Sequence, residues 1–310
     1  MVTAYYTHAC FLGHDPGPGH PERADRIRAV WQALDAPEFK ALARREPPEA
    51  TPEQLALAHP RDHVDEVLGA LPDDGYVMFD GDTIASPGTR EAALRAAGAV
   101  IAAVDEVMAR RAKNAFCAVR PPGHHAEPDR AMGFCLFNNV VIGAKHAMKK
   151  HGLTRVAMID FDVHHGNGSE TAARRDPHLF YGSTHQSPFY PGTGQSNDPG
   201  VPNLVNAPLP RGAGSLDFRR AMERIVLPAL AGFAPELVMI SAGFDAHKDD
   251  PLANLQLTEP DFAWATAKIA DIAAKHAQGR LVSMLEGGYN LAALAKSVGV
   301  HVRALMEAGA

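Results

Sequence analysis

Side chains that commonly bind metals follow an apolar run in the segment RVAMIDFDVHHGNG, which spans residues 155–168. Val156 to Ile159 has the apolar character of a buried strand, and Asp160, Asp162 and His164 follow at alternate positions. Because side chains alternate along a strand, these three groups are expected to project from one face where the strand ends. Two carboxylates and an imidazole gathered there would repel or remain unpaired without a cation. We therefore interpret this segment as half of a metal site.

Three further predicted strands also end in residues that can do chemistry. The segments that follow them are Gly123-His124-His125, Asp245 with His247, and Glu286-Gly-Gly-Tyr289. Ligands of parallel α/β sheets bind beyond the carboxyl ends of the strands, so these segments are expected to converge. Asp162, His164 and Asp245 would then form a three-ligand set. Such a set suits zinc with an open position, or another divalent transition metal such as iron or cobalt.

The paired imidazoles and the tyrosine suggest groups that could work beside a metal. His124 and His125 follow a rigid Pro-Pro-Gly turn, and imidazoles titrate near neutrality, so the pair suits proton transfer to and from an activated water. Tyr289 follows Gly287-Gly288, and its hydroxyl is suited to donate to a developing oxyanion. The plainer alternatives are two capping or core histidines and an ordinary amphipathic tyrosine. Covalent catalysis is disfavoured, because the chain has no G-x-S-x-G motif and no cysteine in a convincing Cys/His setting.

Alternating strands and helices are expected to position these groups. The predicted strands are 2–7, 115–119, 156–159, 179–183, 236–241 and 281–285, and the predicted helices are 21–34, 53–58, 61–71, 88–111, 138–151, 215–231, 258–277 and one that ends near 307. Residues 76–87 and 185–200 are expected to be loops. This alternation indicates an α/β fold with a mostly parallel sheet covered on both faces. No break in composition demands a second domain, so residues 1–310 are predicted to form a single domain.

Composition narrows the classes of partner. The chain has 310 residues and a formal net charge of -6, which indicates no basic face for nucleic acid. Cys10, Cys117 and Cys135 are far apart in the sequence, so a disulfide framework is not expected and a reducing cytoplasm fits. The N-terminal residues lack a signal-peptide pattern, and no apolar run is long enough to span a membrane. We expect a cytoplasmic protein with no membrane partner.

Taken together, the motifs resemble the zinc-dependent histone deacetylase superfamily, which includes bacterial histone deacetylase-like amidohydrolases and acetylpolyamine amidohydrolases. The matching segments are GHPERADR, RPPGHHAE, MGFCLFNN, DFDVHHGNG, FYPGTG, SAGFDAHKDDPL and LEGGYN, in family order from residue 19 to 290. The resemblance implies an arginase-like, three-layer α/β fold in which helices flank a mostly parallel central sheet of about eight strands.

The resemblance also implies roles for matching positions. Asp162, His164 and Asp245 correspond to the ligands of one zinc ion. The implied catalytic residues are His124 paired with Asp160, His125 as general base oriented by Asn167, and Tyr289 as the group that polarises the acetyl carbonyl. The implied substrate-binding residues are Gly133, Phe134 and Tyr190 in the walls of an acyl-lysine channel, with Asp82 as a looser match at its rim. A structural potassium site would involve Asp160, Asp162 and main-chain atoms of His164 with Ser183 and Thr184.

Asn167 stands where some relatives carry a second aspartate beside the histidine pair. An amide can orient His125 but stabilises its protonated form less than a carboxylate does, so the pKa of His125 should be lower than in those relatives. Asn167 and LEGGYN both resemble the class II branch of the family. A tyrosine at 289 favours an active deacetylase that releases acetate and a primary amine.

Several alternatives remain open from the sequence alone. An arginase-type two-metal ureohydrolase would need aspartates where Gly166 and His247 stand, and the metal content per chain would distinguish it. A catalytically inactive module that binds acetyl-lysine is a second alternative. Within the enzyme interpretation, the substrate is acetyl-lysine in peptides or proteins, an acetylated polyamine, or another small amide or ester. The native metal and any homo-oligomer also stay undetermined.

Overall fold

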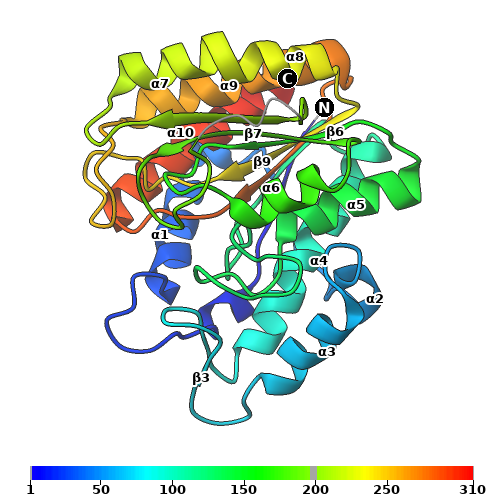
Figure 1. Cartoon of the computed structure of the whole chain (residues 1–310), viewed down its shortest axis with the longest axis vertical. Coiled ribbons are helices and arrows are strands. Elements are labelled where there is room, and N and C mark those ends of the chain that lie inside the picture. Colours follow the sequence, from blue (N-terminus) through cyan, green and yellow to red (C-terminus); the bar gives the residue numbers. More distant parts are fainter. Residues whose placement is uncertain (1, 196–200, 310) are drawn as a thin grey trace.

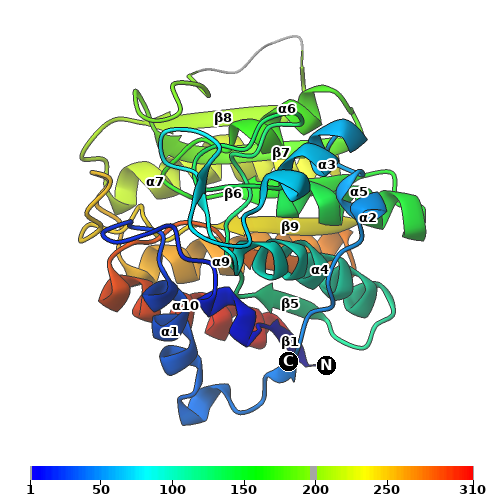
Figure 2. The same ribbon diagram turned by 90° about the horizontal axis from the view of Figure 1, so that it is seen from below.

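Eight parallel strands form one sheet in a computed structural model that describes residues 2–195 and 201–309. The strand order is β2-β1-β5-β10-β9-β6-β7-β8, and Figure 2 shows the succession from β8 to β1. The strands are β1 (Thr3–Tyr6), β2 (Ala43–Arg45), β5 (Asn114–Cys117), β6 (Val156–Asp160), β7 (Leu179–Gln186), β8 (Leu204–Leu209), β9 (Leu237–Ala242) and β10 (Leu281–Leu285). Every neighbouring pair is parallel, which confirms the predicted sheet.

Helices cover both faces of this sheet, as the prediction of a three-layer fold required. Figure 1 shows α7 to α10 over one face and α4 to α6 over the other. The helices are α1 (Ala24–Leu34), α2 (Pro52–Leu55), α3 (Arg61–Ala70), α4 (Thr89–Met108), α5 (Asn139–His151), α6 (Asn167–Arg174), α7 (Ser215–Ala221), α8 (Leu227–Phe233), α9 (Glu259–His276) and α10 (Leu291–Gly309). Because helices shield both faces, every residue of the central strands β6, β9 and β10 is buried.

The register of the central strands brings their carboxyl ends to one level. Asp160, the last residue of β6, pairs with Ser183 of β7 on one side and with Ser241 of β9 on the other. β10 lies beside β9 and pairs with it through Leu285 and Ala242. The segments that follow β6, β9 and β10 therefore leave the sheet next to one another. This placement is what the sequence predicted for the candidate site.

Local signals set the helices that lead to and from these strands. Asn138 caps α5, because its side chain accepts a hydrogen bond of 3.1 Å from the Val141 amide. The same helix ends at Gly152, whose φ of 70° is the left-handed conformation that glycine adopts at helix ends. Thr258 and Asp261 form a capping box at the start of α9.

Several element predictions were wrong. The edge strands β2 and β8 were not predicted, and β7 extends to Gln186 rather than ending at 183. The expected loop at 76–87 contains a two-stranded antiparallel ribbon, β3 (Val77–Met78) and β4 (Ile84–Ala85). The helix predicted at 215–231 is divided by a π-helical turn, Met222–Val226, between α7 and α8. Residues 196–200 of the predicted 185–200 loop lie outside the described residues.

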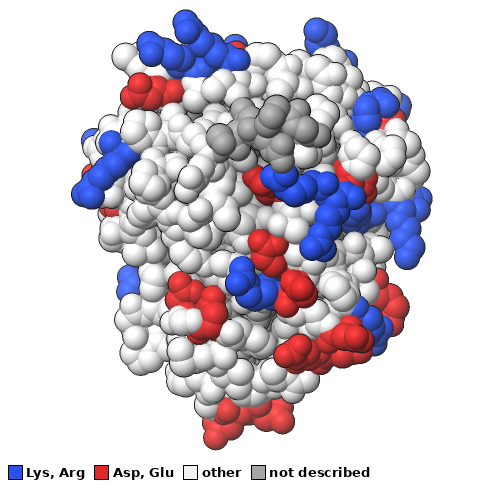
Figure 3. Space-filling model, in the orientation of Figure 1, with Lys and Arg blue, Asp and Glu red and all other residues white. Residues whose placement is uncertain are grey.

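Charged side chains are unevenly distributed over the face of the molecule seen in Figure 3. Acidic side chains gather at the end of the molecule that carries β3, whereas basic groups lie elsewhere on the same face (Figure 3). Within residues 2–195 and 201–309, no helix combines the length and the apolar character needed to cross a bilayer.

Candidate active site

Three predicted metal ligands converge where β6 and β9 end. His164 Nδ1 lies 3.0 Å from Asp162 Oδ1 and 3.2 Å from Asp245 Oδ2. These separations are close to the distance of about 3.3 Å between neighbouring ligand atoms around a tetrahedral zinc ion. Asp245 Oδ2 is buried and lies beside the His164 imidazole, but it accepts no hydrogen bond of good geometry from the described residues. Two buried carboxylates that share one imidazole favour a cation between them, so the donor set fits a divalent metal.

Backbone contacts and two glycines hold these carboxylates in place. The amides of His164 and Gly287 each donate a hydrogen bond of 2.9 Å to Asp162, and the Val163 amide donates one of 2.9 Å to Asp245. A Cβ atom at Gly243 would lie 1.9 Å from Asp162 Oδ2, and one at Gly287 would lie 2.0 Å from Asp245 Oδ2. Side chains at these glycine positions would therefore displace the candidate ligands.

The electrostatics of the cluster favour a positive charge between the carboxylates. Burial acts to lower the pKa of His164, but Asp162 and Asp245 outweigh it and raise that pKa to about 10. Burial and the neighbouring Asp162 raise the pKa of Asp245 to about 7. The same field that retains a proton on His164 would favour a metal cation in its place.

The histidine pair stands beside this cluster, and each ring is held by a different partner. His124 Nδ1 lies 2.9 Å from Asp160 Oδ2, and His125 Nδ1 lies 2.9 Å from Asn167 Oδ1. Asn167 Nδ2 donates to Glu127 Oε1 at 2.6 Å, which assigns its Oδ1 as the acceptor toward His125. His125 therefore carries its proton on Nδ1 and leaves Nε2 as the acceptor.

The two imidazoles differ in charge as well as in partner. Burial acts to lower the pKa of His124, but Asp160 and Asp162 raise it to about 10. Burial, together with His124 and His164, lowers the pKa of His125 well below its usual range. A cationic and a neutral imidazole thus lie side by side, with ring centroids 4.0 Å apart.

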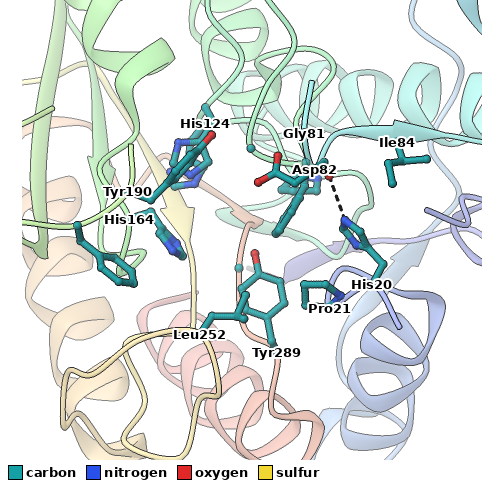
Figure 4. Close-up of a pocket in the computed structure, with 16 residues that line it drawn as sticks. His20, Pro21, Gly81, Asp82, Ile84, His124, His164, Tyr190, Leu252 and Tyr289 are labelled. Carbon is teal, nitrogen blue, oxygen red and sulfur yellow. Dashed lines mark hydrogen bonds between the residues drawn. The ribbon is translucent and has the colours of Figure 1, made fainter. Parts of the chain in front are cut away.

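These groups open into a pocket of about 390 Å³. Its lining includes His124, His125 and His164 together with the aromatic rings of Phe134, Phe189, Tyr190 and Tyr289. In Figure 4 the Tyr289 hydroxyl points to the middle of this pocket, across from His164. Asp160 and Asn167 lie behind the imidazoles and do not line the pocket, and the buried Asp162 and Asp245 contact the pocket residue His164.

A tight turn presents the predicted channel residues Gly133 and Phe134. Met132 and Cys135 exchange backbone hydrogen bonds of 3.1 and 3.0 Å around them, and φ is 59° at Gly133 and 68° at Phe134. Positive φ at both central residues is the pattern of a type I′ turn. A Cβ atom at Gly133 would lie 2.5 Å from His125 Cδ2, so glycine lets the turn approach the imidazole.

At the mouth of the pocket, His20 and Asp82 are joined. His20 Nε2 contacts the Asp82 carbonyl oxygen at 3.0 Å, and both residues line the pocket (Figure 4). Burial and the adjacent Asp80 raise the pKa of Asp82. No role was predicted for His20. A loop histidine distant in sequence gave no signal of this placement.

Several residues that hold the site were not assigned a role from the sequence. Glu286 accepts hydrogen bonds from the amides of Gly123 and His124 at 2.7 and 3.2 Å, and from Ser241 Oγ at 3.0 Å. It therefore ties the histidine loop to β9 and β10. The Asp250 carboxylate accepts a bond of 2.7 Å from the Tyr289 amide. Glu286 lies in the segment LEGGYN and Asp250 in SAGFDAHKDDPL. Their place in these matching segments was the sequence signal that could have identified them.

A buried ion-pair network supports Tyr289 from below. The Arg26 guanidinium lies 4.9 Å from the centroid of the Tyr289 ring and donates to the Gly288 carbonyl oxygen at 2.6 Å. Glu22 binds both Arg26 and Arg120, at 2.9 and 2.6 Å. Burial raises the pKa of Tyr289 well above its usual range, although Arg26 opposes the shift. The phenol is thus kept as a hydrogen-bond donor.

Comparison with known proteins identifies the same family as the sequence motifs, and the match covers most of the chain. Residues 20–305 match the histone deacetylase domain. The chain is 42% identical to a histone deacetylase-like amidohydrolase of Pseudomonas aeruginosa, over 88% of this chain and 73% of that protein. It is 40% identical to histone deacetylase 14, chloroplastic, of Arabidopsis thaliana, over 97% of this chain and 76% of that protein.

One further relative and one solved structure support the same family and fold. A probable deacetylase of Archaeoglobus fulgidus is 35% identical over 99% of this chain and 89% of that protein. The crystal structure of the HDA15 HD domain superimposes with a TM-score of 0.92, at 34% identity, over 99% of this chain and 88% of that one. The predicted family resemblance and fold are therefore both confirmed.

Proposed function

Because the chain belongs to the histone deacetylase family, we propose that it is a zinc-dependent deacetylase. It would hydrolyse the acetyl amide of acetyl-lysine, or of a related N-acetylated amine, to acetate and the free amine. One observation carries this proposal: His164, which clusters with the buried Asp162 and Asp245, lines the same pocket as His125 and Tyr289. A ligand set, a base and a hydrogen-bond donor therefore face one cavity.

Zinc held by Asp162, His164 and Asp245 would supply a Lewis acid for the acetyl carbonyl and lower the pKa of water. Nε2 of neutral His125 accepts the proton of the attacking water, while Asn167 fixes the ring through Nδ1. The proton then passes from the histidine pair to the leaving amine. The Tyr289 hydroxyl donates a hydrogen bond to the carbonyl oxygen as negative charge develops on it.

The walls of the pocket suit the methylene stem of an acylated lysine. Phe134 and Tyr289 stand edge to face with centroids 6.0 Å apart, and Tyr190 stands edge to face with His125 at 5.1 Å. Flat rings bury an aliphatic chain without needing polar partners. Gly133 contributes backbone next to His125, and Asp82 at the mouth would hold the backbone amide of a peptide substrate.

A structural potassium ion is part of the same proposal. Asp160 lies beside Ser183 at the end of β6, and Thr184 Oγ1 is buried without a hydrogen-bond partner among the described residues. Oxygen-rich surroundings of this kind suit a hard cation. Turnover that rises on replacing sodium by potassium in the buffer would support the site, and indifference to the exchange would count against it.

The proposal also covers the domain organisation and the cellular compartment. One sheet that uses strands from Thr3 to Leu285 supports a single domain over residues 1–310. Three cysteines without disulfides support a reducing compartment such as the cytoplasm, although two of the plant relatives are described as chloroplastic.

Acetate release with matched substrates tests the function. We expect wild-type protein to release acetate from an acetyl-lysine peptide or from N-acetylputrescine, and Tyr289→Phe to lose most of that activity against either. The ratio of the two wild-type kcat/KM values identifies the substrate class. Binding of the acetyl-lysine peptide without release of acetate would instead favour the inactive binding module.

A further inference from the structure

A second cluster of side chains that can bind a metal lies near the amino ends of the strands. This is the edge of the sheet opposite the candidate active site. Asp105 is on α4, and His146 and His151 are on α5. Both helices end just before a strand begins, α4 before β5 and α5 before β6, so their last turns lie beside the amino ends of the strands. The two helices pack against each other along the sheet (Figure 2). The cluster is therefore separate from the candidate active site.

The three side chains aim at one point. His146 Nε2 lies 2.9 Å and His151 Nε2 lies 2.7 Å from the same oxygen, Asp105 Oδ1. The ligand atoms all lie within 4.8 Å of one another, and the two rings are inclined at 76°. The histidine side chains are 9% and 21% exposed and that of Asp105 is 25% exposed, so an ion can reach the cluster from solvent.

We propose that Asp105, His146 and His151 bind a second divalent transition-metal ion, zinc or another ion that imidazole prefers. Neighbouring ligand atoms around a tetrahedral zinc ion are about 3.3 Å apart. The two distances from imidazole Nε2 to Asp105 Oδ1 would therefore need to lengthen by only about 0.5 Å. Two imidazoles and one carboxylate are a common zinc ligand set, with water completing the coordination. The bound ion would tie the C-terminal end of α4 to the C-terminal half of α5.

Lys150 sets the strength of this site. Its ammonium lies 2.8 Å from Asp105 Oδ2, the carboxylate oxygen that the imidazoles do not contact. It thus leaves Oδ1 for the metal, but its positive charge opposes a nearby dication. Among the described residues, a further cluster outside the active site, His8 with Cys10 and Glu91, is less suited to a metal. Burial raises the pKa of the Cys10 thiol to about 12, and His8 Nδ1 already accepts a bond from the Cys10 amide.

Zinc content per chain tests the proposal directly. Wild-type protein is loaded with Zn²⁺, freed of excess ion by gel filtration and analysed for zinc. The His146→Ala/His151→Ala double variant should hold one equivalent fewer than wild type. His178→Ala, which removes an exposed imidazole elsewhere, should hold the wild-type amount. The difference between variants is the readout, so it stands whether or not zinc also occupies the candidate active site. Equal zinc content in wild type and the double variant would overturn the proposal.

Two milder variants guard against loss of folding. His151→Gln retains a polar side chain, and excess zinc should raise the melting temperature of wild type more than that of this variant. Lys150→Gln removes the opposing charge and should tighten binding of the second equivalent by about threefold to tenfold. Turnover of an acetylated substrate should stay within about twofold of wild type in both, because distant sites act independently. An equal zinc-induced shift in His151→Gln, or no tightening in Lys150→Gln, would contradict the proposed site.

Discussion

The carboxyl edge of the sheet, where the strands end, and its amino edge, where they begin, each carry three converging side chains of types that can bind a metal, with opposite compositions. At the carboxyl edge two carboxylates surround one imidazole, and at the amino edge two imidazoles share one carboxylate. His164 of the first cluster lines a pocket that a neutral histidine and a phenol also line, whereas the second cluster lies between the C-terminal halves of two helices. Donor atoms alone are therefore compatible with either a catalytic or a structural ion. The groups that face the ion decide which chemistry follows.

Burial separates the two clusters further. Asp162 and Asp245 are fully buried, glycines at 243 and 287 make room for them, and backbone amides donate to both, so backbone contacts fix much of their geometry. Asp105 is partly exposed and is held by a lysine and two imidazoles from a neighbouring helix. Changes at the carboxyl edge should therefore act on catalysis, and changes at the amino edge on metal content and stability.

The largest contrast should come from replacing one histidine at each edge. His125→Ala removes the proton acceptor and should lower kcat/KM for an acetylated substrate by about 10²- to 10⁴-fold. His151→Ala should leave kcat/KM nearly unchanged, because it lies outside the pocket. Steady-state acetate release measures both. Similar losses in the two variants would erase the proposed distinction between the edges.

A somewhat smaller loss is expected from the phenol. Tyr289→Phe keeps the ring that packs on Phe134 and Arg26 but removes the hydrogen-bond donor, and kcat should fall by about 10²- to 10³-fold. KM and zinc content should change little, since the ring and the ligands remain. A variant with wild-type kcat would mean that the phenol does not act on the carbonyl oxygen.

Asn167 tests whether orientation of the base matters separately from the base itself. Asn167→Ala removes the acceptor that fixes His125 Nδ1, and kcat should fall by about 10- to 100-fold, less than in His125→Ala. Adding Asn167→Ala to His125→Ala should cost little more, because both act through one imidazole. Fully multiplicative losses in the double variant would show that Asn167 acts by another route.

The contact between His165 and Glu170 should affect stability rather than metal binding. Burial acts to raise the pKa of Glu170, but hydrogen bonds from His165, Asn206 and Arg174 outweigh it and lower that pKa to about 2. Because the folded-state pKa lies below that of the unfolded chain, Glu170 stabilises the fold fully above about pH 4.5 and loses this contribution as the pH falls toward 2.

Glu170→Gln should therefore lower the free energy of unfolding at pH 7 by about 1–2 kcal/mol. The difference from wild type should shrink as the pH approaches 2, while zinc content stays the same. Denaturant titrations at several pH values measure this. A difference that does not change with pH would show that the ionised carboxylate is not the source of the stability.

The predictable parts of the fold were those with a strong local pattern. Buried central strands such as Leu281–Leu285 and capped helices such as Asn139–His151 follow from apolar runs and helix signals. The strand Ala43–Arg45 was missed because it is a short edge strand with two arginines, and Leu204–Leu209 because it contains a proline. Their pairing depends on β1 and β7, which no local window contains.

The residues of the candidate site also fall into a predictable and an unpredictable group. The candidate ligands, the histidine pair and Tyr289 follow strand ends, so parallel topology sufficed to bring them together. Arg26 and His20 reach the site from loops and a helix more than 60 residues from their partners. The cluster of Asp105, His146 and His151 was also missed, because two helices must pack before those side chains meet. Sequence patterns alone do not specify such long-range contacts.

The most direct test of the account is acetate release before and after metal removal. Wild-type protein treated with a chelator and freed of it should release no acetate from an acetyl-lysine peptide, and added Zn²⁺ should restore turnover. Asp245→Asn, treated in the same way, should not recover. Undiminished acetate release from the metal-free wild type, or full recovery by Asp245→Asn, would contradict a metal-dependent deacetylase built on Asp162, His164 and Asp245.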